Sequence, residues 1–357
     1  MNIFVGIMLI FALIGYIDKL FNLKWGLSKT FDKGFLQMGS LSISVIGIYC
    51  VSLTFLSEHI DLFTSINKYL FFDSSIIIGA ILCPDMGGYP IVNELVTDAS
   101  LVIFSGVLLT SLLGQTITFQ LPIFLSFVDE REMNKVMRGF AIGIVCVPVG
   151  LLLCIPLLGI SILNVLPIVI LCLVIALCVI KIPTLTIKIL GGFAKIIKAL
   201  SYIFFLMVIV GLYFPSLQYV ETILVEDSTL MILKMCIIIS GSMVLSELVL
   251  RYASDYIEKI ANLLKINKES VIGFILNLTS SLAMLPLYNR MDEKGKLLNA
   301  SFSVSGAYVF GGQMAFIAGV AADSVMIYVG LKLLCGLLSV ILMNVIYERT
   351  RMNDYEV

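Results

Sequence analysis

The sequence has little charge and almost no histidine. Of its 357 residues 13% are charged, His59 is the single histidine, and the eight cysteines occur singly in apolar stretches without a CxxC pair. Zinc and iron–sulfur sites need clustered ligands, so this pattern excludes a recognisable site of either kind. The net charge of −1 argues against nucleic acid as a partner. We therefore expect no metal and no cofactor.

Apolar residues make up 60% of the chain, and the mean hydropathy is +1.07. Apolar runs recur at close to the ~20 residues that cross ~30 Å of hydrocarbon, so we predict an all-α polytopic membrane protein surrounded by the lipid bilayer. The first run lacks a preceding basic segment and a small-residue cleavage site, and we expect it to be retained. The nine predicted spans are residues 2–16, 35–56, 101–127, 136–160, 163–180, 200–214, 230–250, 297–320 and 324–346.

Two further apolar segments, residues 74–95 and 270–290, contain helix breakers. Two prolines and two glycines interrupt the first between residues 84 and 90, and the second is interrupted around residues 277–286. Lysine and arginine in short loops collect on the cytoplasmic side. All basic loops reach that side only if each broken segment returns to the face from which it came. We predict two opposed re-entrant hairpins, with the N-terminus outside and the C-terminus cytoplasmic.

These hairpins divide the chain into two similar halves of opposite orientation. The stretch GQTITF (residues 114–119) follows the first hairpin, and GQMAF (residues 312–316) follows the second. Inverted repeats with broken helices are typical of secondary transporters, whose sites form at the breaks. We predict a first repeat at 1–160 with hairpin 74–95, a linking helix and amphipathic connector at 161–198, and a second repeat at 199–357 with hairpin 270–290.

Polar residues at the two breaks form the candidate substrate site. Irregular backbone at membrane depth is tolerated where protein or a water-filled cavity satisfies its polar groups. Asp85 would cost about 2.5–3.5 kcal/mol at the bilayer centre, which a cationic ligand would offset. Capping of the returning half-helix is an equally good reading of Asp85. The other candidates are Gly87, Gly88, Gln115, Asn277, Thr279, Ser280, Ser281 and Gln313, and for each polar one an interhelical hydrogen bond is the alternative role.

Several stretches resemble the ethanolamine permease family of bacterial ethanolamine-utilisation operons. They are CPDMGGYPIVNELV (83–96), LYNRMDEKGKLLNASFSVSGAYVFGG (287–312), GFLQMGSLSISVIGI (34–48) and AIGIVCVPVG (141–150), and they run in order over most of the chain. The resemblance implies an inner-membrane carrier that brings in ethanolamine. The chain departs from the family pattern at Ser280 to Ala283, where members carry Asn-Asn-Ile-Pro, and at Gly311 to Gln313, where they carry Gly-Asp-His.

Together these observations predict a transporter that takes up ethanolamine, a small protonated amino alcohol, by alternating access. Asp85 would hold the ammonium, Gln115 and Gln313 would orient the hydroxyl, and the tip at residues 277–281 would close the other side. A carrier for another small cationic amine and a non-transporting amine receptor stay open as alternatives, as does a homo-oligomer. An intramembrane enzyme is disfavoured, because the apolar interior offers one carboxylate and no histidine for paired catalytic groups.

Overall fold

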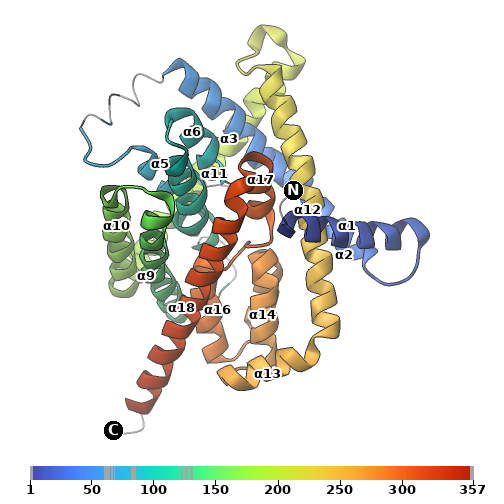
Figure 1. Ribbon diagram of the computed structural model, residues 1–357, viewed down its shortest axis with the longest axis vertical. Helices are drawn as coiled ribbons and strands as arrows, with labels where there is room; N and C mark the ends of the chain where they lie inside the picture. Colours follow the sequence, from blue (N-terminus) through green and yellow to red (C-terminus); the bar gives the residue numbers. More distant parts are fainter. Residues whose placement is uncertain are drawn as a thin grey trace.

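The computed structural model describes residues 3–59, 69–81, 86–121 and 132–353, together with residues 65, 67, 124 and 128. Every regular element in that part of the chain is helical (Figure 1). The elements are α1 (Ile3–Phe21), α2 (Ser28–Phe35), α3 (Met38–Glu58), α5 (Ser75–Ile81), α6 (Gly88–Leu95), α7 (Ala99–Leu101), η2 (Val102–Gly114), η3 (Thr116–Gln120), α9 (Met133–Leu158), α10 (Ile162–Lys181), α11 (Pro183–Tyr213), η5 (Pro215–Leu217), α12 (Thr222–Tyr252), α13 (Ser254–Leu264), α14 (Lys268–Thr279), α15 (Ser281–Tyr288), α16 (Glu293–Ser305), α17 (Gly312–Val320), η6 (Ala322–Ser324) and α18 (Val325–Asn353).

Seven helical segments in the described residues are long and apolar enough to cross a membrane. They comprise α1, the run from α7 to η3, and most or all of α9, α10, α11, α12 and α18. In Figure 1, α9 and α10 lie together on one flank, α12 lies on the other, and the long α18 runs between them. The helical, multi-pass class is confirmed, whereas nine spans, the inverted repeat and membrane re-entry stay predictions.

The segment predicted as one span at residues 297–320 is not a continuous helix. It consists of α16 and α17, separated by residues 306–311, which we call the strap. Tyr308 within the strap has a left-handed backbone, with a φ of 59°. The helix breaks because strap backbone groups bond to another element: the Tyr308 N–H donates to Asn277 O (3.0 Å), and the Phe310 N–H donates to Leu278 O (2.9 Å).

The amphipathic connector expected before residue 199 is not separate from the span that follows it. Residues 183–213 form the single helix α11, which begins at Pro183, a residue suited to the first helical turn. The pair Gly191 and Gly192 does not end the helix. Each glycine costs about 1 kcal/mol relative to alanine, and the long apolar helix on either side offsets that cost.

The helix at residues 99–120 is the most enclosed of the seven segments, because 94% of its apolar 18-residue stretch is buried. Most of it is π-helix, in which residue i pairs with residue i+5 rather than i+4. Hydroxyl groups along it donate to its own backbone carbonyls, as Thr110 does to Ser105 O (2.9 Å) and Thr116 does to Leu112 O (2.6 Å). Such side-chain bonds compete with the regular α-helical pattern and account for the wider turn.

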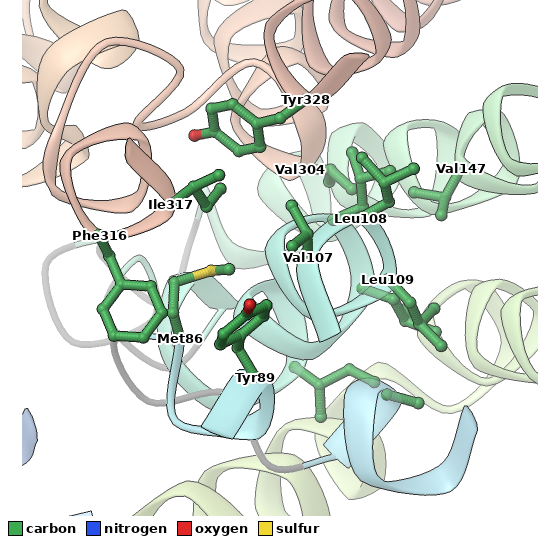
Figure 2. Packing of buried hydrophobic residues seen from close by; sticks show 14 of the residues in the cluster. Met86, Tyr89, Val107, Leu108, Leu109, Val147, Val304, Phe316, Ile317 and Tyr328 are labelled. Atoms are coloured by element: carbon green, nitrogen blue, oxygen red, sulfur yellow. The ribbon is translucent and has the colours of Figure 1, made fainter. Parts of the chain in front are cut away.

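The buried core forms around this π-helix from both halves of the chain. Figure 2 shows Val107, Leu108 and Leu109 of η2 close to residues of α9, α16, α17 and α18. On the other side, Tyr89 of α6 packs edge-on against Phe316 of α17, with ring centroids 6.0 Å apart. The Tyr89 hydroxyl also donates to Val320 O (3.3 Å). The core therefore places η2 and η3 where both halves of the chain can reach them.

Candidate functional site

Helices α14 and α15 form a hairpin whose two ends meet. Near its base, the Asn267 side chain donates to Arg290 O (2.7 Å) and the Ser270 hydroxyl donates to Asp292 (2.9 Å). The arms have 12 and 8 residues, about 18 and 12 Å at 1.5 Å per residue, so neither crosses ~30 Å of hydrocarbon. Helices α5 and α6, with 7 and 8 residues, also pack against each other.

The tip of the second hairpin lies against the strap. Ser280 breaks the hairpin with an extended backbone (φ −161°, ψ 119°). That break leaves Asn277 O and Leu278 O without the helical partners they would otherwise have, and the strap N–H groups occupy them. The break at Ser280 and the strap thus satisfy each other's backbone hydrogen-bonding groups. The contact is close, because a Cβ placed on Gly311 would collide with Thr279 O.

Four buried polar side chains beside this crossing form a chain of hydrogen bonds, which we call the amide–hydroxyl cluster. Gln120 of η3 donates to the Ser281 hydroxyl (2.6 Å), which donates to Asn277 Oδ1 (2.5 Å). The Asn277 amide donates in turn to the hydroxyl of Ser303 on α16 (2.5 Å). All four side chains are fully buried. The cluster therefore joins the π-helix, the hairpin tip and α16.

The glutamines of the π-helix retain unused acceptor atoms. Gln115 Oε1 and Gln120 Oε1 are buried and have no hydrogen-bond partner among the described residues. Residues five apart lie about one turn apart in a π-helix, whereas an α-helix would separate them by about 140°. An unsatisfied buried acceptor costs about 1–3 kcal/mol. A ligand with hydrogen-bond donors would remove that cost, so these oxygens favour a donor-rich ligand.

A second group, which we call the lysine cluster, surrounds Lys332 of α18. The fully buried Lys332 donates from Nζ to Ser111 O of η2 (2.9 Å) and to Gln313 Oε1 of α17 (2.7 Å). The ammonium also lies 5.5 Å from the ring centroid of Tyr328, whose hydroxyl donates to Tyr308 O in the strap (2.8 Å). Both clusters thus contact the same stretch of π-helix, residues 111–120.

The structure places some of the predicted site residues in the two clusters and others apart from them. Asn277 and Ser281 meet in the amide–hydroxyl cluster, and Gln313 belongs to the lysine cluster. Gln115 lies between the two clusters along the π-helix, whereas Thr279 donates only locally, to Leu276 O (2.9 Å). Ser280 forms the hairpin break, and Gly87 and Gly88 start α6. Asp85 lies outside the described residues, and the substrate-binding roles of all nine stay predictions.

Sequence reasoning missed Gln120, Ser303 and Lys332. Lys332 has a recognisable signal, because a lone lysine inside an otherwise apolar helix is rare and marks a functional position in membrane proteins. One series of polar residues in the buried helix recurs every five positions, at Ser105, Thr110, Gln115 and Gln120, beside other polar residues at Ser111, Thr116 and Thr118. That period fits a π-helix and would have linked Gln120 to Gln115.

Metal binding finds no support in the part of the chain that the structure describes. No group of three or more His, Cys, Asp or Glu side chains gathers there as metal ligands would. The polar groups of both clusters are amides, hydroxyls, backbone carbonyls and one ammonium. The oxygens among these groups can accept hydrogen bonds from an organic ligand, and the amides and hydroxyls can donate to one.

Comparison with known proteins gives one family. The model described as "Ethanolamine utilisation protein, EutH" matches residues 1–346. A "Probable ethanolamine permease EutH" from Listeria monocytogenes is 27% identical over 350 residues, covering 95% of this chain and 92% of that protein. One of the same name from Salmonella typhimurium is 24% identical over 359 residues (89% and 88%), and the uncharacterized protein YxeR from Bacillus subtilis is 27% identical over 328 residues (89% and 87%). No solved structure matches the chain.

Proposed function

Because this chain belongs to the EutH family of ethanolamine utilisation proteins, we propose that it is a membrane transporter for ethanolamine. Relatives that bear the name of a probable ethanolamine permease align with most of the chain, which supports transport and not catalysis. We place the protein in the cytoplasmic membrane as a multi-pass protein, with its N-terminus outside and its C-terminus in the cytoplasm.

The observation that carries the proposal is the pair of unsatisfied acceptors, Gln115 Oε1 and Gln120 Oε1, buried beside the crossing of two broken elements. Ethanolamine is mostly protonated near neutral pH, as lysine's amine is. Its ammonium offers three donors, and its hydroxyl both donates and accepts. The ligand would therefore satisfy both glutamine oxygens and still offer an oxygen to a neighbouring amide or hydroxyl.

We assign the counter-charge to Asp85, which precedes Met86 in the sequence. At 4 Å and an effective dielectric near 20, a carboxylate and an ammonium attract by about 4 kcal/mol. That attraction exceeds the ~2.5–3.5 kcal/mol cost of a carboxylate at the bilayer centre. Gln115 and Gln313 would orient the hydroxyl, and the glycines at positions 87 and 88 would let the backbone come close to the ligand.

Alternating access would use the contact between the hairpin tip and the strap. Two backbone hydrogen bonds, from the Tyr308 N–H and the Phe310 N–H, join these segments. Each contributes about 0.5–1.5 kcal/mol, so the contact can be exchanged for others at modest cost during a transport cycle. In this mechanism the tip and the strap separate to open the amide–hydroxyl cluster to one side of the membrane.

The test is uptake of labelled ethanolamine into liposomes that contain the purified protein. We expect saturable accumulation by the unaltered protein and a loss of about tenfold or more in Gln115→Leu and Asp85→Asn, because each removes a group that the ammonium or hydroxyl would bind. Gln115→Leu is informative because it removes an unsatisfied buried oxygen, so thermal stability should not fall.

Ser240→Ala is the matched control, since the Ser240 hydroxyl is also buried without a partner but lies on α12. It should transport normally. Binding of ethanolamine without accumulation would identify a receptor, and accumulation of a different amine in preference to ethanolamine would identify another carrier. Unchanged uptake by both Gln115→Leu and Asp85→Asn would remove the assigned site.

A further inference from the structure

We propose that the ammonium of Lys332 is a tethered substitute for the ammonium of the substrate. It would occupy oxygens at the edge of the substrate site, Ser111 O and Gln313 Oε1, while the carrier is empty, and the substrate would displace it on binding. This inference rests on the proposed function, because it assumes that a protonated amine is carried. It concerns how the empty carrier returns to collect another substrate.

The surroundings of Lys332 are those of a built ammonium site. A backbone carbonyl oxygen, Ser111 O, accepts at 2.9 Å, and an amide oxygen, Gln313 Oε1, accepts at 2.7 Å. The face of the Tyr328 ring adds a cation–π contact at 5.5 Å. Oxygen acceptors and an aromatic face are the groups that bind any primary ammonium, whether it ends a lysine side chain or an ethanolamine molecule.

The lysine reaches the place where the substrate is proposed to bind. Its acceptor Gln313 is one of the proposed ligands, and Ser111 lies about one π-helical turn before Gln115. Lys332 itself lies seven residues after the start of α18, about 10 Å along that helix, within its apolar part. The groups around its ammonium come from η2, α17 and α18, so they belong to both halves of the chain.

A carrier that works by alternating access buries its site in each half of its cycle. After the substrate has left, acceptor oxygens without a donor would penalise the closed state and slow the return of the empty carrier. The Lys332 ammonium supplies donors from within the protein to two of the oxygens beside the site, Ser111 O and Gln313 Oε1. When substrate enters, its hydroxyl competes with Lys332 for Gln313 Oε1 and the two ammonium groups repel each other, so Lys332 withdraws.

The proposed role of Lys332 affects two modes of transport differently, net uptake and exchange. Net uptake requires the empty carrier to return, whereas exchange of labelled for unlabelled substrate returns the carrier loaded. Lys332→Gln keeps a hydrogen-bonding side chain but removes the cation. We expect net uptake to fall by about tenfold or more, because the empty carrier would return without the cation, and exchange to stay close to that of the unaltered protein, because the carrier then returns loaded.

Two variants make the comparison specific. Lys332→Arg retains the charge, so its ratio of net uptake to exchange should be close to that of the unaltered protein. Lys294→Gln removes another lysine with little exposed surface, which pairs with Glu348 (2.6 Å) on a different part of α18. Its ratio should match that of the unaltered protein, even if its stability falls.

The outcomes distinguish this inference from the proposed function. If the unaltered protein neither accumulates nor exchanges ethanolamine, the proposed function fails and the role of Lys332 fails with it. If the unaltered protein transports but Lys332→Gln loses both modes equally, or neither, the role of Lys332 alone is rejected.

Discussion

The contact between the strap and the hairpin tip can be tested with a single methyl group. In Gly311→Ala the new Cβ would collide with Thr279 O and lie 3.2 Å from the Thr279 carbonyl carbon. Both atoms belong to backbone, so no side-chain rotation relieves the collision. Overpacking of this kind costs about 1–3 kcal/mol.

If the strap moved to relieve the collision, the cost in free energy would be similar. Moving residues 306–311 away lengthens the bonds from Tyr308 N to Asn277 O and from Phe310 N to Leu278 O. Each is worth about 0.5–1.5 kcal/mol, so the two routes lead to the same range of destabilisation. We expect a fall of several degrees in the unfolding temperature, measured in detergent by loss of the monodisperse chromatographic peak.

The neighbouring glycine provides the control. In Gly312→Ala the nearest atom to the new Cβ is Ile239 Cδ1 at 3.5 Å, an ordinary van der Waals distance. This variant should differ from the parent protein by less than about 0.5 kcal/mol. Transport by Gly311→Ala should fall as well, because the amide–hydroxyl cluster depends on the position of the tip. Equal stability and equal transport in the two variants would refute the close contact between the strap and the tip.

Two other glycines mark close approaches of backbone to backbone. In Gly79→Ala the new Cβ would collide with Ser105 O, so we expect lower thermal stability and impaired uptake, because α5 would be pushed away from η2; normal uptake would contradict this. In Gly241→Ala it would collide with Met8 O, where α1 crosses α12 outside both clusters, so stability should fall while the KM for uptake stays unchanged. Gly330→Ala is the control for both, since its Cβ meets no described atom within 4 Å and alanine favours helix by about 0.5–1 kcal/mol.

Hydropathy predicted the bounds of two continuous spans closely. The span predicted at residues 163–180 is the helix Ile162–Lys181, and that at 136–160 is Met133–Leu158. These agree because hydrocarbon thickness sets the length of a crossing, which is a local property of sequence. The break at the strap was not predicted, since it exists only because Asn277 O and Leu278 O lie beside it.

The candidate site was predicted in part for the same reason. Asn277 and Ser281 were identified because they lie at a break, and the structure brings them into one hydrogen-bonded chain. Lys332 and Gln120 were missed, because no break in their own helices marks them. Their importance depends on partners more than one hundred residues away in sequence, at Ser111 and Ser281 respectively.

The sequence by itself determined that this chain is a helical membrane protein with polar residues at its interruptions, because apolar length and helix-breaking residues act locally. Only the tertiary structure decided that the hairpin tip and the strap satisfy each other, and that an ammonium from α18 lies among oxygens of η2 and α17. The contact between Lys332 and Ser111 joins segments from both halves of the chain. Buried polar groups must find partners, but the sequence does not state which of many distant groups will come within hydrogen-bonding distance.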